Sequence, residues 1–311
     1  MGKQVFLRIC DYIFVMRPLI LIPAWSFYLI GAGQALQGYP QAQHVFPAPT
    51  VLISLTAILI TAYLLNQIFD RQSDEKNRKC RFLADGIFAV RTLIILALAA
   101  YAVASYTFRQ IGDAQRLPLI AALILSLIYS LPPFRLCARP FVDLLANAVG
   151  FGGIAFILGH GLFPSGGGES MRLAIPYVLL VGATFLHTTV LDMTGDKETG
   201  KISTTVLIGV RSSKIAAAAL HVLALAFSIL GGAPLPIALT AASLPLSLYA
   251  LKEADVTASS LQVQGTTLIV TLGAVILWPA YLVLLLPLIL LSRYYHRRRF
   301  GLIYPGFVKK S

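Results

Sequence analysis

Long apolar runs alternate with short polar links along most of the chain. Each run holds about 20 residues, the length that an α-helix needs to cross the hydrocarbon core of a bilayer. The runs are continuously apolar rather than alternating, which favours helices over the strands of a membrane barrel. The pattern predicts membrane-spanning helices near residues 18–36, 47–67, 88–108, 117–132, 142–163, 173–191, 213–231, 233–251 and 263–291. The last run contains Trp278 and Pro279, so it predicts either one helix or a broken pair.

Composition agrees with an all-α, polytopic membrane protein. Hydrophobic residues make up 57% of the 311 positions and charged residues only 12%, about half the charged fraction of a soluble domain. The mean hydropathy is +0.78. Cys10, Cys80 and Cys137 lack metal-binding spacing, so they predict neither a zinc site nor a disulfide framework. We expect one integral-membrane domain over residues 1–311, with a basic tail at 293–311.

The net charge of +12 is more informative about membrane topology than about binding partners. No basic stretch is interleaved with exposed aromatic residues in a soluble segment, so nucleic-acid binding is not expected. Most charge lies in the links "DRQSDEKNRKCRF", "RLCARP", "DKETGKISTTVLIGVRSSK" and "KEAD". The positive-inside rule places these links in the cytoplasm, which predicts a multi-pass protein of the cytoplasmic membrane. Nine spans would put the basic segment "RYYHRRRF" on the opposite side, and the sequence does not resolve this disagreement.

Two of the charged links carry regularly spaced acceptor side chains. Asn66, Asp70 and Asp74 recur every fourth residue, and Asp192 and Asp196 repeat that spacing. Side chains four positions apart share one face of a helix, so the first set predicts a single acceptor stripe. Clustered carboxylates repel one another, and Mg²⁺ offsets that repulsion because it prefers oxygen ligands and bridges carboxylates to substrate phosphates. The matched spacing also suggests a two-half pseudo-repeat.

Other interpretations of these segments stay open. The carboxylates could be solvated charges that cap helix ends, or the acidic gate of an ion or lipid transporter. Transport carboxylates usually lie within a span, whereas these lie at the membrane edge among basic residues. Carboxylates beside Arg and Lys favour a site for Mg²⁺ and a polyphosphate.

The acidic segments resemble those of a known enzyme family. "NQIFDRQSD" is similar to the N-x-x-x-D-x-x-x-D motif of the UbiA family of intramembrane prenyltransferases, and "LDMTGDKETGK" is similar to its second, D-x-x-x-D motif. "YSLPPFRL", "NRKCRFLADGIFAVR" and "MRPL" are similar to further stretches of that family. The resemblance covers residues from roughly 15 to 215 in the same order. This chain departs from the family pattern at two positions. Many members have Asp where this chain has Gln67, and a basic residue where it has Cys137.

The resemblance implies a bundle of nine transmembrane helices around a central cavity, with the acidic motifs at its cytoplasmic mouth. It also implies that Mg²⁺ binds the diphosphate of a polyprenyl donor and that an acceptor attacks the resulting allylic cation. The implied metal ligands and catalytic residues are Asp70, Asp74, Asp192 and Asp196, together with Tyr129 as a catalytic aromatic residue. The implied substrate-binding residues are Asn66, Arg17, Arg71, Arg81, Ser130, Arg135, Lys197 and Lys201.

Some assignments keep a simpler alternative. Tyr129 could be an interface-belt tyrosine and Arg17 a positive-inside anchor. His187, near Asp192, is expected to be a packed polar residue of its helix rather than a base. The acceptor is expected to be an aromatic compound or a polar lipid, with "RFLADG" closer to members that act on chlorophyllide or glyceryl lipids. A catalytically silent member of the superfamily is the remaining alternative.

Overall fold

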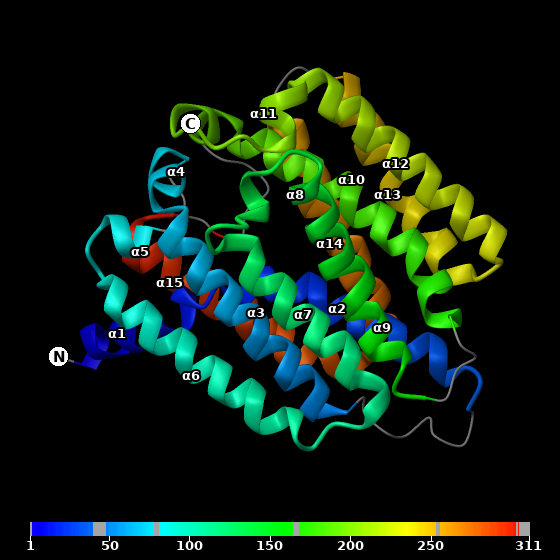
Figure 1. Ribbon diagram of the computed structural model, residues 1–311, viewed down its shortest axis with the longest axis horizontal. Helices are drawn as coiled ribbons and strands as arrows, with labels where there is room; N and C mark the ends of the chain where they lie inside the picture. The colour runs from blue at the N-terminus through cyan, green and yellow to red at the C-terminus, as the bar shows by residue number, and fades with distance from the viewer. Residues whose placement is uncertain are drawn as a thin grey trace.

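The computed structural model consists of helices, and its described residues contain no strand (Figure 1). It describes residues 2–39, 48–77, 81–163, 168–252, 256–302 and 304. The long helices are α2 (Pro18–Leu36), α3 (Pro49–Phe69), α6 (Val90–Phe108), α7 (Asp113–Ser130), α10 (Glu169–Glu198), α12 (Val210–Gly231), α13 (Pro234–Lys252), α14 (Val256–Leu277) and α15 (Leu282–Phe300). The shorter elements are α1 (Gly2–Val15), α4 (Arg71–Lys76), α5 (Arg81–Ala84), η2 (Leu136–Ala138), α8 (Val142–Asn147), η3 (Ala148–Ile154), α9 (Ala155–His160), α11 (Thr204–Ile208) and η4 (Pro279–Tyr281).

Within the described residues, nine helical segments are long and apolar enough to cross a membrane. Eight are single helices, from α2 to α14, and the ninth is Val142–His160, in which α8, η3 and α9 follow one another. Large apolar side chains on them stay exposed, such as Leu98 at 62% and Ile276 at 75%. Such outward-facing residues suit a lipid environment. The prediction of an all-α, multi-pass membrane protein is confirmed. The spans agree with the predicted runs to within a few residues, except at the last run and at α10, which continues beyond the predicted 173–191 to Glu198.

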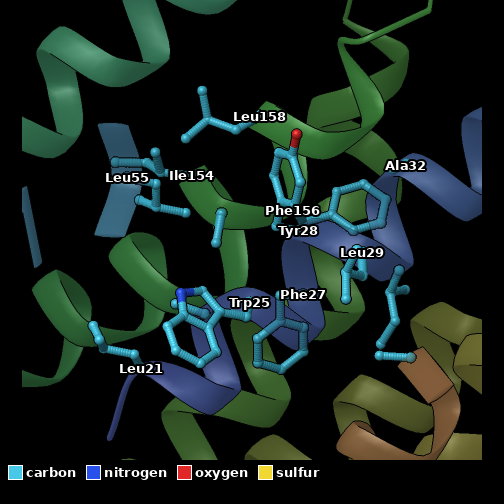
Figure 2. Close-up of a cluster of buried hydrophobic side chains, with 14 of the residues drawn as sticks. Leu21, Trp25, Phe27, Tyr28, Leu29, Ala32, Leu55, Ile154, Phe156 and Leu158 are labelled. Atoms are coloured by element: carbon cyan, nitrogen blue, oxygen red, sulfur yellow. The ribbon is translucent and has the colours of Figure 1, made fainter. Parts of the chain in front are cut away.

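The bundle is held together by close packing around α2. This helix packs against α9 and α14, while α3 packs against α6 and α7 and α10 against α12 (Figure 1). Figure 2 shows aromatic and branched side chains of α2 gathered with Phe156 of α9 in the main core. A Cβ on Gly31 or Gly159 would collide with the backbone of the facing helix. Small residues at this crossing therefore let α2 and α9 approach closely, as in other membrane helix pairs.

The last apolar run forms two helices rather than one. Helix α14 ends at Leu277, beside Gly33 near the end of α2. The chain then turns, and Trp278 Nε1 donates a hydrogen bond to the carbonyl of Leu29 at 2.8 Å. Tyr281 Oη donates to the carbonyl of Ile22 at 3.3 Å, so the chain runs back along α2 toward its beginning. The broken-pair alternative from the sequence is the one that the structure adopts.

The return of α15 brings the basic C-terminal residues beside the N-terminal helix. Tyr295 Oη donates to Asp11 Oδ1 at 2.5 Å, and Arg299 contacts both oxygens of Asp11, at 3.0 and 3.1 Å. Asp11 lies in α1 and is only 3% exposed. The basic end of α15 therefore lies at the same end of the bundle as α1, which removes the disagreement with the positive-inside rule.

Candidate functional site

The first acidic segment is bent at Asp70. Helix α3 ends at Phe69, Asp70 adopts φ −102° and ψ 16°, and the short helix α4 begins at Arg71. The predicted single stripe of Asn66, Asp70 and Asp74 on one helix is therefore wrong, because the helix breaks in its middle. Asn66 and Asp70 still meet, since Asn66 Nδ2 donates to Asp70 Oδ2 at 3.0 Å. Asp74 lies on α4 instead.

Asp70 is a buried carboxylate with two cationic partners. Arg135 Nη2 lies 2.8 Å from its Oδ1, and Lys201 Nζ lies 2.8 Å from its Oδ2. The side chain of Asp70 is 4% exposed, so these ion pairs are shielded from solvent on the aspartate side. A buried charge needs such partners, because desolvation alone would be costly. The structure thus brings together the motif aspartate and two of the predicted substrate-binding cations.

These pairs also set the protonation states of the three groups. Burial by itself raises the pKa of Asp70, but the charges and hydrogen bonds of Lys201 and Arg135 hold it below its ordinary value. Burial lowers the pKa of Lys201, yet Asp70 and Asp196 raise it overall. The Arg135 pKa is likewise raised, because Asp70 outweighs desolvation. All three groups are therefore charged at neutral pH.

The second acidic segment lies at the end of α10 and meets the first directly. Ser73 of α4 donates to Asp196 Oδ1 at 2.5 Å. Lys201 Nζ, already bound to Asp70, lies 3.6 Å from the same Asp196 oxygen. The backbone N–H of Lys201 donates to the carbonyl of Asp196 at 2.9 Å. One lysine thus links the aspartates of both motifs.

Helix α4 is clamped onto α10 by Asn77. Its Nδ2 donates to the carbonyl of Asp192 at 3.0 Å, and its Oδ1 accepts from the backbone N–H of Gly195 at 3.0 Å. The close approach requires glycine, because a Cβ at Gly195 would lie 2.5 Å from Asn77 Cγ. Asp192 is half-buried and faces this junction through its backbone. The amide of Asn77 therefore holds the two acidic segments side by side.

A cavity of about 230 Å³ opens where these elements meet. Both cations and one carboxylate line it, together with short polar residues and the loop after α10. The lining residues are Phe69, Asp70, Gln72, Ser73, Arg135, Ala138, Thr199, Gly200, Lys201 and Ile202. A small, strongly polar cavity with two cationic side chains suits a phosphorylated ligand.

The carboxylates offer oxygen ligands without forming a closed metal cage. Among the described residues, no three His, Cys, Asp or Glu side chains converge closely enough to hold a metal ion by themselves. Asp74 Oδ2 is buried, and among the described residues it has no hydrogen-bond partner. Mg²⁺ is usually bound by one or two carboxylates plus substrate phosphates, which fits this arrangement.

Other predicted residues lie around the cavity rather than in it. Tyr129, in the last turn of α7, accepts a hydrogen bond from Asn147 Nδ2 at 2.8 Å and lies near Lys201. Ser130 is fully buried, and its hydroxyl has no hydrogen-bond partner in the described part of the chain. Arg17 joins α1 to α2 in a left-handed conformation with φ 56° and lies near Tyr63. Tyr129 and Ser130 thus lie together at the end of α7, and both Arg17 and Tyr129 are near Tyr63 of α3.

The remaining predicted cations differ in their placement. Arg71 and Lys197 are exposed, on α4 and α10, and neither lines the cavity. The side chain of Arg81 lies outside the described residues. His187 is fully buried in α10, with its Nδ1 3.1 Å from Ser259 Oγ, as expected of a packed polar residue.

Several residues that build the site were not predicted. Ser73, Asn77 and Asp143 each bind a backbone or side-chain group of a distant segment. Gln67, which departs from the family pattern, is buried and donates to the carbonyl of Val15 at 2.8 Å. The one available signal was position, because Ser73 and Asn77 stand within the first acidic link.

Comparison with known proteins identifies the family. The profile described as the UbiA prenyltransferase family matches residues 21–262, well over half of the chain. This chain belongs to the UbiA prenyltransferase family. The UbiA profile covers both acidic segments, Arg135 and the cavity lining, so the family match and the site coincide.

A curated relative and a solved structure both match this chain at low sequence identity. The bacteriochlorophyll synthase 34 kDa chain of Chloroflexus aurantiacus is 23% identical over 171 residues, 53% of this chain and 53% of that protein. The match thus spans about half the length of this curated relative. A UbiA homologue from Archaeoglobus fulgidus, solved with GPP and Mg²⁺, superposes with a TM-score of 0.70 at 20% identity, covering 86% of this chain and 98% of that one.

Two further solved structures share the UbiA fold. A digeranylgeranylglyceryl phosphate synthase superposes with a TM-score of 0.61 at 17% identity. An apo UbiA homologue from Aeropyrum pernix K1 superposes with a TM-score of 0.59 at 18% identity. Each covers 86% of this chain and 98% of its own. The expected family and fold are confirmed.

Proposed function

We propose that this protein transfers a polyprenyl group from a polyprenyl diphosphate to an aromatic or polar-lipid acceptor in the membrane. The observation that carries the proposal is the cavity lined by Asp70, Arg135 and Lys201, beside which Asp196 of the second motif is paired with the same lysine. Family membership supports the same chemistry.

The reaction separates charge, and the site contains the groups to stabilise it. The C1–O bond of the donor breaks with its electron pair leaving on the diphosphate. The acceptor then forms a bond to C1 and gives up a proton. Arg135 and Lys201 both line the cavity, so they would neutralise the developing charge on the diphosphate. Tyr129 lies nearby, and its ring would stabilise the allylic cation by a cation–π contact.

The carboxylates fit a magnesium ion bound together with the substrate. Asp70, Asp74, Asp192 and Asp196 would supply oxygen ligands, and Asp74 Oδ2, which no described residue contacts by a hydrogen bond, is the oxygen most available to a cation. When bound, Mg²⁺ would neutralise phosphate charge and lower the barrier to diphosphate departure. Asn66 would orient Asp70 through its hydrogen bond to Oδ2.

The orientation in the membrane is inferred from the charge distribution, and the acceptor class is inferred from the relatives. The basic C-terminal end of α15 and the two acidic segments would face the cytoplasm by the positive-inside rule. The acceptor class to test first is a tetrapyrrole carboxylate, because one relative is named bacteriochlorophyll synthase, followed by glyceryl lipids.

The test uses purified full-length protein in detergent or vesicles with a radiolabelled polyprenyl diphosphate. We expect Mg²⁺-dependent release of diphosphate and a labelled lipid product when the acceptor is supplied, and loss of both after chelation. Ion or lipid flux across vesicles without product formation would contradict the proposal and favour a transporter.

A further inference from the structure

A carboxylate outside both acidic motifs is completely buried beside the site. Asp143, near the start of α8, is 1% exposed. Its Oδ2 accepts the backbone N–H of Thr204 at 2.8 Å, and its Oδ1 accepts the N–H of Leu144 at 2.7 Å and the hydroxyl of Thr204. Within the described part of the chain, hydrogen bonds rather than a contacting cation satisfy this carboxylate. A buried carboxylate is costly, so it depends on these hydrogen bonds.

Thr204, the hydrogen-bond partner of Asp143, stands at the end of the chain segment that carries Lys201. Thr204 begins α11, and its hydroxyl also accepts the backbone N–H of Phe141 at 2.7 Å. At the other end of the segment, Gly200 turns the chain with φ 73°, and Lys201 N–H is bound to Asp196. The segment between α10 and α11 is therefore fixed at both ends, once by α10 and once by Asp143.

We propose that Asp143 is a positioning residue for Lys201. Its hydrogen bonds to Thr204 hold the segment so that the Lys201 ammonium reaches between Asp70 and Asp196. Asp143 does not line the cavity and touches no reacting group, so it acts through the lysine. A lysine side chain has a flexible four-carbon stem, and its placement depends on a fixed backbone. The consequence for turnover rests on the proposed function, whereas the placement of Lys201 does not.

The first experiment measures the placement directly. Purified full-length protein is treated with an amine-acylating reagent, and labelling of each lysine is followed by mass spectrometry. Lys201 is 16% exposed and paired, so it should react slowly, whereas the exposed Lys197 serves as the internal reference. Asp143→Asn should raise the Lys201 rate toward that of Lys197, because the lysine would no longer be held between Asp70 and Asp196.

The matched control is another buried carboxylate far from the cavity. Asp11→Asn removes hydrogen-bond acceptors for Tyr295 and Arg299 and should leave the Lys201 labelling rate unchanged. If Asp143→Asn does not fold, Thr204→Val and Thr204→Ser replace it. The valine removes the hydroxyl and should expose Lys201, whereas the serine keeps the hydroxyl and should restore wild-type protection. Unchanged protection of Lys201 in a folded Asp143→Asn or Thr204→Val protein would overturn the inference.

The second experiment asks whether Asp143 acts only through the lysine. Asp143→Asn should lower kcat by about 10- to 100-fold with a smaller change in KM. In a Lys201→Ala background the same substitution should cost less than about twofold, because the group it positions is gone. Full additivity of the two losses would overturn the inference. A wild-type protein that releases no diphosphate would instead refute the proposed function and leave the labelling result to decide the role of Asp143.

Discussion

Asp70 binds its two cations on separate oxygens, Arg135 on Oδ1 and Lys201 on Oδ2. Neither cation can replace the other, because each reaches from a different loop and approaches a different side of the carboxylate. Removing one partner leaves a buried charge half-compensated, which is more damaging than the loss of a surface pair. The site is therefore sensitive to single substitutions at either cation.

Arg135→Ala is expected to lower turnover by about a hundredfold, the scale seen when one donor to a developing anion is removed. Arg135→Lys should recover only part of the loss, because a planar guanidinium binds phosphate oxygens in a way that an ammonium does not. Steady-state kinetics at limiting and saturating donor measure both effects.

The matched control lies in the same loop. Arg139 is exposed and donates to the carbonyl of Pro133 at 2.9 Å, so Arg139→Ala should change turnover little. Equal activity of Arg135→Ala and wild type at limiting donor would remove Arg135 from the site.

Single residues differed in how well the sequence predicted them. Charged residues in a motif are visible as a pattern, so Asp70, Arg135 and Lys201 could be nominated together, and the structure brings them into contact. Ser73 and Asn77 carry no charge or period that marks them. Their function depends on which distant segment folds against them, and one sequence does not contain that information.

At the scale of elements, the junction between α4 and α10 joins the two acidic segments. It depends on the absence of a side chain at Gly195, where Asn77 packs against the helix. Helices that approach this closely tolerate only small residues at the contact. The distance between the acidic segments is therefore set by one glycine and one amide.

Gly195→Ala should push α4 away from α10 and lower turnover by about tenfold, as the loss of a supporting contact typically does. Gly182→Ala on the same helix is the control, because its added Cβ would meet no atom closer than 3.5 Å. Both substitutions raise helix propensity equally, so only steric conflict separates them. Equal activity of the two variants would contradict the role of the junction.

Helix α15 makes a second prediction about elements. Because Arg299 and Tyr295 reach Asp11 of α1, the two ends of the chain should lie on the same side of the membrane. Protease-cleavable tags placed at both ends should become accessible together in vesicles of one orientation. Cleavage of one tag from outside while the other stays protected would contradict the packing of α15 against α1.

For the whole molecule, hydropathy was a sufficient guide to the spans because a bilayer requires about 20 apolar residues for each crossing helix. It was a poor guide to breaks within an apolar or polar segment. The bend at Asp70 lies beside the contact of Asn77 with Gly195 of α10. At the end of α14, Pro279 follows Trp278, and Trp278 is hydrogen-bonded to Leu29 of α2. Local composition does not report such contacts, so the continuous acceptor stripe was wrong and the number of helices in the last run stayed open.

At the same scale, the two halves of the chain form one shared site. Helices α3 and α4 bring Asp70 to the cavity lined by Arg135 and Lys201, and α10 brings Asp196 to the same lysine. Asp70 and Asp196 are coupled through the same ammonium group. Groups that act as a unit lose their effect together when any one is removed.

A double-mutant cycle on diphosphate release tests this shared site most directly. Asp70→Asn and Asp196→Asn should each lower turnover at least about a hundredfold, which corresponds to about 2.7 kcal/mol of transition-state stabilisation. The double variant should be little worse than either single one, and added Mg²⁺ should recover part of each single loss. Strictly additive free energies in the cycle, or full activity in the presence of a chelator, would contradict the account.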